Sequence, residues 1–204
     1  MSEELELFRE NVRRFVKEEV APNYLQWEKD GIFPRHLWNK LGEQGLLAVD
    51  IPEEYEGVGA DFLFSMVIQE EFSKANCAAV GGPMAVHSDI VSHYILNYGT
   101  QSQKQTYLPK MVSGDCIGAV AMTEPGTGSD LQGVRTSAKR DGDDYVINGS
   151  KTFITNGQHC DLIIVVARTN LDVPGAKGTT LFMVDSDASG FQRGRNLEKI
   201  GLHA

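Results

Sequence analysis

A loop with two closely spaced glycines and three hydroxyl side chains lies at residues 119–131. Gly126 and Gly128 carry no Cβ, so a ligand can approach the backbone closely there. The hydroxyls belong to Thr123, Thr127 and Ser129. Hydroxyls and free backbone amides can bind the phosphate or ring oxygens of a cofactor. The loop is therefore a candidate cofactor site, and a tight structural turn is the alternative.

The two glycines do not fit a dinucleotide-binding fingerprint. That fingerprint requires a third glycine at position 131, which is Leu131, and a helix directly after the loop. A strand pattern follows instead. The sequence also contains no phosphate-binding Walker motif, no nucleophile elbow and no metalloprotease helix. Spacing alone therefore leaves the choice between a ligand loop and a turn open.

Metal-ligand spacing is absent from the sequence. The three cysteines and five histidines are scattered, which favours reduced thiols and histidines at the surface or the edge of the core. Asp141, Asp143 and Asp144 lack the spacing of a calcium loop and are typical of a hairpin turn. We expect no metal site.

Composition and charge exclude several classes of protein. The chain has 204 residues, 41% of them hydrophobic, and a net charge of −9, which argues against a nucleic-acid surface. No apolar run approaches the ~18 residues of a membrane span. The acidic, amphipathic amino terminus resembles neither a signal peptide nor a transit peptide, so we expect a bacterial-type protein in the cytoplasm.

Helical patterns fill the first half of the chain. Residues 5–20 form an amphipathic pattern that Pro22 is expected to end. Residues 61–74 are apolar on most faces, which predicts a buried helix, and a second apolar helix is expected at residues 80–98. Thr100 and Gln103 form a capping box for a further helix that ends near Gly114.

Strand patterns begin after residue 115. Residues 134–140 and 144–148 alternate around a turn at residues 141–143, which predicts a hairpin. Further strands are expected at residues 151–155, 162–168, 179–184 and 191–195. The chain is thus expected to divide into a helical domain at residues 1–115 and an incomplete β domain at residues 116–204.

Three motifs in the same order resemble those of the acyl-CoA dehydrogenase family. MTEPGTGSD at residues 122–130 resembles the family signature, and NGSKTFITNG at residues 148–157 resembles its second flavin motif. GLL at residues 45–47 with IPEEYEG at residues 51–57 resembles the connector of the helical domain. The resemblance covers essentially the whole chain and is strongest to long-chain-type members.

The resemblance implies an α+β fold: an amino-terminal all-α helical domain followed by an antiparallel β-barrel-like middle domain. Family members are considerably longer, so the carboxy-terminal helical domain is expected to be absent from these residues. In the family FAD lies between the middle domain and that third domain. The resemblance also implies a homotetramer or homodimer for the full-length protein.

The resemblance assigns flavin and substrate contacts by position. The expected FAD-binding residues are Val120, Met122, Thr123, Gly128, Ser129, Phe153, Ile154 and Thr155. Thr123 is expected near the pyrimidine edge, and the hydroxyl and amide of Thr155 near flavin N5, where a hydrogen bond favours negative charge on the reduced ring. Ser129 is expected between FAD and acyl-CoA, and Ala176 and Lys177 near the CoA moiety.

The implied reaction is α,β-dehydrogenation of fatty acyl-CoA thioesters to trans-2-enoyl-CoA. A carboxylate removes the α-proton, a hydride passes to the flavin, and an electron-transfer flavoprotein reoxidises the enzyme. The family's catalytic glutamate lies beyond Ala204, so no catalytic residue is expected here, and Glu53, Glu54 and Glu124 are read as structural or surface groups. Two alternatives are a non-catalytic fragment that binds flavin weakly or not at all, and an acyl-CoA oxidase or flavin monooxygenase on the same scaffold.

Overall fold

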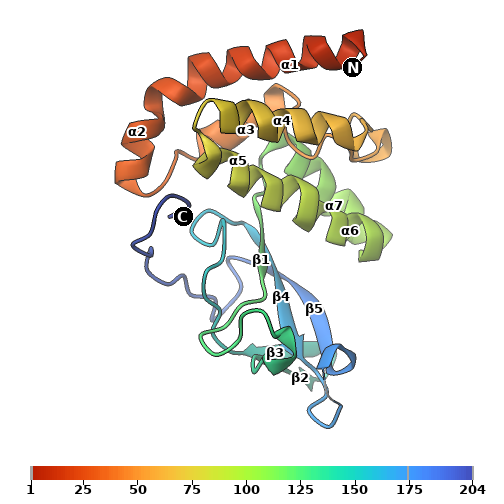
Figure 1. The fold of residues 1–204 in the computed structure, drawn as a ribbon. Coiled ribbons are helices and arrows are strands. Elements are labelled where there is room, and N and C mark those ends of the chain that lie inside the picture. Colours follow the sequence, from red (N-terminus) through yellow and green to blue (C-terminus); the bar gives the residue numbers. More distant parts are fainter. Residues whose placement is uncertain (1, 174, 204) are drawn as a thin grey trace.

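A computed structural model describes residues 2–173 and 175–203. Helices form one end of the molecule and a small sheet forms the other end. The carboxyl end of the chain returns toward α2 (Figure 1). The helices are α1 (Glu3–Phe15), α2 (Ala21–Asp30), α3 (His36–Glu43), α4 (Phe62–Lys74), α5 (Ala78–Ala85), α6 (Ser92–Tyr98) and α7 (Gln101–Ser113). The strands are β1 (Gly118–Ala121), β2 (Ser137–Asp141), β3 (Asp144–Asn148), β4 (Leu162–Arg168) and β5 (Thr179–Asp185).

The first helix does not end at Pro22, contrary to expectation. A wider π-helical turn, η1 (Val16–Val20), follows α1, and the chain continues into α2, which has proline at its amino-terminal end. A proline in the first helical turn is tolerated because that N–H has no intrahelical partner. The helix ends instead at Gly31, whose φ of 72° is the left-handed conformation that favours glycine.

Helix α1 packs on α4 through apolar residues and a cluster of ion pairs. Val12 and Phe72 lie in the same buried cluster. Glu71 is almost fully buried, and it accepts hydrogen bonds from Arg9 at 2.9 Å and Arg13 at 2.8 Å. The Arg13 hydrogen bond lowers the pKa of Glu71 to about 2, although burial opposes it. The buried carboxylate is thus held ionised between two guanidinium groups.

Helix α4 is only partly buried, which corrects the expectation from its composition. Val67, Ile68 and Phe72 lie in the core, whereas Phe62 and Met66 leave more than half of their surface exposed. An apolar sequence predicts burial only where another element covers each face. One face of α4 has no such cover within the described residues.

The remaining helices follow their local signals more closely. Thr100 and Gln103 form the predicted capping box at the start of α7, and Gly114, with a φ of 80°, ends that helix. The second apolar helix begins earlier than expected, at α5, and includes a π-helical segment, η3 (Val86–Val91), before α6. In the part of the chain that the structure describes, no helix is long and apolar enough to cross a membrane.

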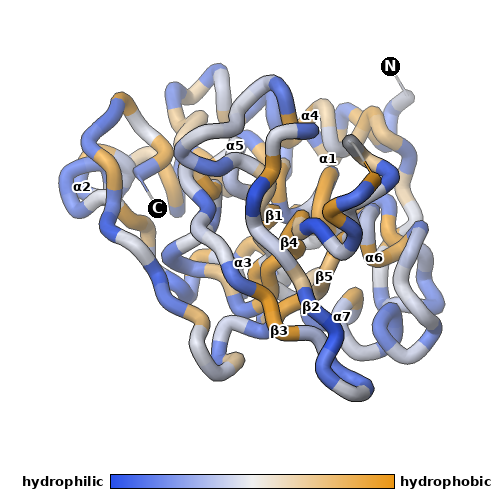
Figure 2. Tube along the Cα trace, turned by 90° about the horizontal axis from the view of Figure 1, so that it is seen from below, coloured by the Kyte–Doolittle hydropathy of each residue, from blue (hydrophilic) through white to orange (hydrophobic). Residues whose placement is uncertain are grey.

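The sheet is mixed rather than antiparallel, and it is not a closed barrel. Its order is β1-β4-β2-β3, and β5 pairs with β4. The β2–β3 and β4–β5 pairs are antiparallel, whereas β1 and β2 run parallel to β4. The connection from β1 returns the chain to the same end of the sheet before β4 begins, which makes that pair parallel. Figure 2, a view from below, shows the apolar strands β1, β4 and β5 close together in front of the helices.

Four of the six predicted strands form, as β2, β3, β4 and β5, whereas the strands predicted at residues 151–155 and 191–195 do not. The β2–β3 hairpin has the predicted turn, in which Gly142 has a φ of 64°. Phe153 and Asn156 have φ values of 56° and 66°, and positive φ is incompatible with a strand. Residues 191–195 are also irregular.

His87 joins the helices to the first strand. Its ring is fully buried; Nε2–H donates to the Met111 carbonyl and Nδ1 accepts from the Gly118 N–H, both at 3.0 Å. These partners require the neutral tautomer with the proton on Nε2. Burial accordingly lowers the pKa of His87 to about 4. The histidine is thus a core residue, more deeply placed than the surface or core-edge position expected.

We expect protonation of His87 to destabilise the protein in mild acid. The native pKa lies below the usual value near 6.5, so the unfolded chain binds the proton first and stability falls as the pH drops from about 6.5 toward 4. Between pH 7 and pH 5, wild type should lose about 2 kcal/mol more unfolding free energy than His87→Gln. Urea unfolding of both proteins at each pH measures this difference, and equal losses would contradict the assignment.

Candidate functional site

The loop after β1 is a tight turn with an open backbone. Glu124 and Thr127 exchange two backbone hydrogen bonds of 3.0 Å, which place Pro125 and Gly126 at the tip. Gly126 and Gly128 are exposed, and a Cβ built on either would have no heavy atom within 4 Å. The turn and the ligand-loop interpretations are therefore compatible, because the turn leaves its glycine backbone free for a ligand.

The carboxylate of Glu124 holds the base of this loop. It is 6% exposed and accepts the backbone N–H groups of Arg135 and Thr136 at 2.7 and 2.9 Å, together with the Thr136 hydroxyl at 2.5 Å. Lys151 Nζ lies 2.9 Å from Glu124 Oε1. Burial would raise the pKa of Glu124, but the hydrogen bonds from Thr136, Arg135 and Lys151 lower it to about 2. Glu124 is thus a structural anion.

Residues 151–156 lie alongside the loop. Lys151 Nζ also donates to the Met122 carbonyl at 2.9 Å, and the Thr152 N–H donates to the Thr123 carbonyl at 2.9 Å. The ring of Phe153 is 68% exposed next to this junction. Ile154 packs on the buried cluster that contains Ala119 and Ala121. The two motifs, more than twenty residues apart, therefore form one continuous surface.

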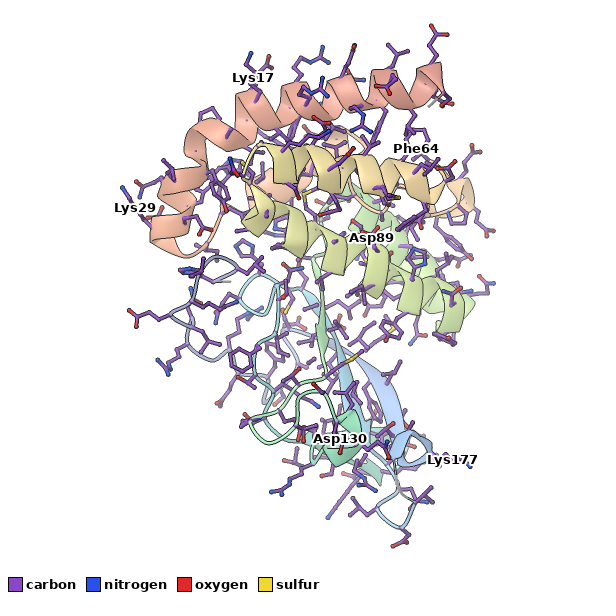
Figure 3. The ribbon with its side chains drawn as sticks, viewed as in Figure 1. Lys17, Lys29, Phe64, Asp89, Asp130 and Lys177 are labelled. Atoms are coloured by element: carbon purple, nitrogen blue, oxygen red, sulfur yellow. The ribbon has the colours of Figure 1, made fainter. Side chains whose placement is uncertain are left out.

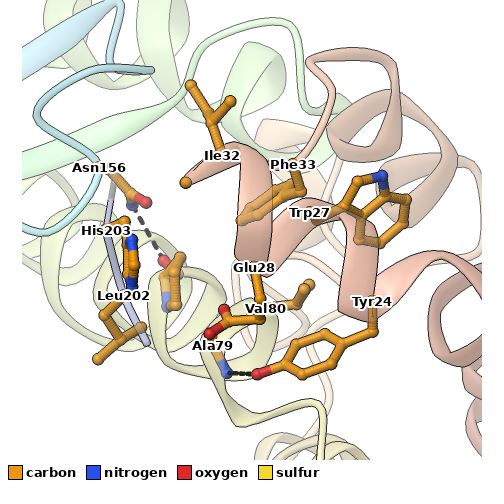
Figure 4. A pocket seen from close by; sticks show the side chains of 12 residues that line it. Tyr24, Trp27, Glu28, Ile32, Phe33, Ala79, Val80, Asn156, Leu202 and His203 are labelled. Carbon is orange, nitrogen blue, oxygen red and sulfur yellow. Dashed lines mark hydrogen bonds between the residues drawn. The ribbon is translucent and has the colours of Figure 1, made fainter. Parts of the chain in front are cut away.

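Asn156 attaches this surface to the helices. Its side chain is buried, and Nδ2 donates to the carbonyls of Pro83 in α5 and Gly118 in β1, each at 3.0 Å. Figure 4 shows Asn156 at the wall of a pocket between α2, α5 and the chain near Leu202. Asparagine tolerates the positive φ found here better than most residues do. The residue therefore sets both the path of the backbone and its distance from α5.

The structure brings the two predicted flavin segments side by side. Met122 and Thr123 contact Lys151 and Thr152, which directly precede Phe153, Ile154 and Thr155. Gly128 and Ser129 are exposed farther along the loop. Val120 differs, because its side chain packs toward the helices in the cluster that contains Ile95 and Leu108. Its predicted role in binding would have to come from the backbone.

The predicted substrate residues lie at one end of the sheet. Ala176 and Lys177 are exposed in a short helix, η5 (Gly175–Gly178), which contacts η4 (Leu131–Gly133), just after Ser129. A Cβ at Gly175 would lie 2.8 Å from Gln132 Oε1. Figure 3 shows Asp130 and Lys177 at the end of the molecule far from α1.

Two supporting residues were missed by reasoning from the sequence. Lys151 and Asn156 lie within the recognised motif at residues 148–157, but they received no role. The available signal was the residue type, because asparagine is enriched at positive φ and a lysine inside an apolar segment requires an acceptor. Within residues 2–173 and 175–203, no group of three or more potential ligands could hold a metal ion.

Two family models match successive parts of the chain. Residues 2–115 match the acyl-CoA dehydrogenase N-terminal domain, and residues 119–204 match the middle domain. The long-chain specific acyl-CoA dehydrogenase of Sus scrofa is 51% identical over 100% of the chain and 47% of its own length. The chain belongs to the acyl-CoA dehydrogenase family.

Solved structures share the fold. An acyl-CoA dehydrogenase from Geobacillus kaustophilus has a TM-score of 0.96 at 49% identity, covering 100% of this chain and 53% of that one. A glutaryl-CoA dehydrogenase from Mycobacterium smegmatis in complex with FADH2 has a TM-score of 0.91 at 29% identity, covering 100% and 51%. The chain thus spans about half the length of these relatives.

Replacing Asn156 should show its structural role. We expect Asn156→Gly, which permits positive φ but removes two buried hydrogen bonds, to lower the unfolding free energy by about 2 kcal/mol. Asn156→Ala should lose roughly 1 kcal/mol more through left-handed strain. Asn76→Gly is the matched control, since Asn76 has a φ of 57° but is exposed, and should change stability by less than about 0.5 kcal/mol. Equal urea midpoints for Asn156→Gly and Asn76→Gly would contradict the role.

Proposed function

We propose that this chain forms the amino-terminal and middle parts of an FAD-dependent acyl-CoA dehydrogenase. The full protein would convert fatty acyl-CoA thioesters to trans-2-enoyl-CoA and pass electrons to an electron-transfer flavoprotein. Family membership supports the oxidoreductase class, and the long-chain relative, at 51% identity, supports a long acyl substrate. The FADH2 complex of the glutaryl-CoA dehydrogenase supports a flavin cofactor.

The observation that carries the proposal is the surface made by residues 122–130 and 151–156. Its residues fit a flavin: the glycine backbone is open, and the Phe153 ring is exposed where an apolar ring could cover it. The Thr123 N–H donates no hydrogen bond to any residue in the described ranges, so it is available to a ligand. Bound FAD would supply the hydride acceptor.

The chain's own residues have supporting roles in this proposal. Backbone donors of the loop bind and orient the cofactor, Phe153 shields it from water, and Ser129 with residues 176–177 lies on the acyl-CoA side. Glu124 is unsuited to remove a proton, because its pKa is about 2 and Lys151 and backbone amides cover its oxygens. Glu53 and Glu54 are exposed in the short helix η2 (Glu53–Tyr55). The proposal therefore assigns no catalytic base to these residues.

Location and assembly are part of the proposal. We also propose that the enzyme is cytoplasmic, and the family resemblance predicts that it assembles as a homotetramer or homodimer. Fractionation of cells and light scattering of the purified protein measure these two properties.

The activity can be tested with the protein expressed from its complete open reading frame. We expect the purified protein to be yellow, to release FAD when denatured, and to be bleached anaerobically by saturated acyl-CoA thioesters, with the highest kcat/KM for long chains. Turnover is measured with an artificial electron acceptor across a series of chain lengths. Failure of every acyl-CoA to reduce the flavin would refute the proposed reaction.

A substitution at Gly128 tests the location of the cofactor. We expect Gly128→Val to weaken FAD binding at least tenfold, since the added side chain would enter open space that the proposal gives to the cofactor. The folded apoprotein should keep its melting temperature. Gly194→Val is the matched control, because Gly194 is also exposed with no heavy atom near a built Cβ. Equal FAD affinity in the two variants, measured by fluorescence titration, would place the cofactor elsewhere.

A further inference from the structure

Lys151 contacts the candidate flavin loop at two points. Its Nζ donates to the Met122 carbonyl and to Glu124 Oε1, both at 2.9 Å, and its side chain is only 10% exposed. A buried ammonium with two well-placed acceptors is ordered, because leaving either contact would leave a desolvated charge. The next residue in sequence holds the neighbouring peptide, through the 2.9 Å hydrogen bond from the Thr152 N–H to the Thr123 carbonyl.

These contacts determine which way the peptide between Met122 and Thr123 faces. A trans peptide is planar, and its C=O and N–H point to opposite sides. Because the Met122 oxygen faces Lys151, the Thr123 N–H faces away from Lys151. That N–H donates to no described residue, although Thr123 is half-buried. A half-buried donor without a protein partner is available to a ligand.

The charge of Lys151 also changes the strength of this donor. A hydrogen bond from an ammonium to a peptide oxygen withdraws electron density from the peptide, which makes the N–H at its other end a stronger donor. The effect is retained in a low-dielectric setting such as this one, where the ammonium and Glu124 are both nearly buried. A neutral side chain of similar length would keep the packing but lose this polarisation.

We propose that Lys151 is a positioning residue for the flavin, which orients and polarises the Met122–Thr123 peptide so that the Thr123 N–H donates to an acceptor atom of the flavin ring. Lys151 acts through the peptide and does not touch the cofactor. Glu124 keeps the ammonium in place and does not itself face the flavin. This inference rests on the proposed flavin-binding function.

The test compares Lys151→Met and Lys151→Gln with Thr136→Val in the protein expressed from the complete open reading frame. Lys151→Met removes the ammonium, and Lys151→Gln retains a neutral donor in case the methionine variant does not fold. Thr136→Val removes a different hydrogen bond to the same oxygen of Glu124, and it leaves Lys151 and the Met122 carbonyl unchanged. The three variants therefore separate loosening of Glu124 from loss of the peptide contact.

We expect Lys151→Met to weaken FAD binding about tenfold. It should also weaken the preference for reduced over oxidised FAD about tenfold, which lowers the midpoint potential by ~30 mV for two electrons. Lys151→Gln should shift both values in the same direction by a smaller factor. Thr136→Val should lower the melting temperature yet keep FAD affinity, the visible flavin spectrum and the potential within about twofold of wild type.

The outcomes distinguish this inference from the function on which it rests. Unchanged FAD affinity and potential in both Lys151 variants, or equal shifts in these variants and in Thr136→Val, would overturn the positioning role while wild type still binds FAD. A wild-type protein that takes up no FAD would overturn the proposed function itself. A shift in the Lys151 variants alone supports the positioning role.

Discussion

The buried ion pair of Glu124 and Lys151 is the interaction on which the candidate site depends. It joins three segments that are distant in sequence: the loop after β1, residues 135–136 just before β2, and Lys151. Burying two charges costs several kcal/mol per ion unless the geometry is good and the remaining hydrogen-bonding capacity is filled. Here the carboxylate receives two backbone amides and a hydroxyl besides the ammonium. The ion pair is therefore tolerated in the interior, and it fixes the geometry of the loop.

A second set of polar contacts attaches this site to the helices. His87 and Asn156 both bond to Gly118, one through its N–H and the other through its carbonyl. Arg35, the residue before α3, donates a hydrogen bond of 2.8 Å to Asp161 Oδ2. The same carboxylate oxygen accepts the Ile117 N–H. Because these partners lie on both sides of the first residue of β1, the helices and the loop after β1 share one junction. The loop that follows β1 is thereby held at a fixed position relative to α3 and α5.

Local signals in the sequence predicted the elements whose causes are local. The capping box at Thr100 and the hairpin turn at Gly142 depend on neighbouring residues alone, and both were confirmed. The mixed sheet and the irregular path of residues 151–156 depend on contacts between distant residues, which periodicity does not contain. Asn156 illustrates the difference, since its conformation is explained by carbonyls at Pro83 and Gly118. The family motifs marked the segments of the site, but they did not show why Lys151 belongs among its supporting residues.

The parallel pairing of β1 with β4 has a consequence for the order of folding. Both segments of the candidate flavin site lie in the connection between these two strands, with the β2–β3 hairpin between them. Pairing these two strands closes a long loop, and such non-local closure is slow compared with helix formation. Helices α1 to α7 are complete in sequence before β1 begins, so a chain emerging from the ribosome can fold its helical half first. We therefore expect the cofactor surface to appear late and in one step, together with the docking of β4.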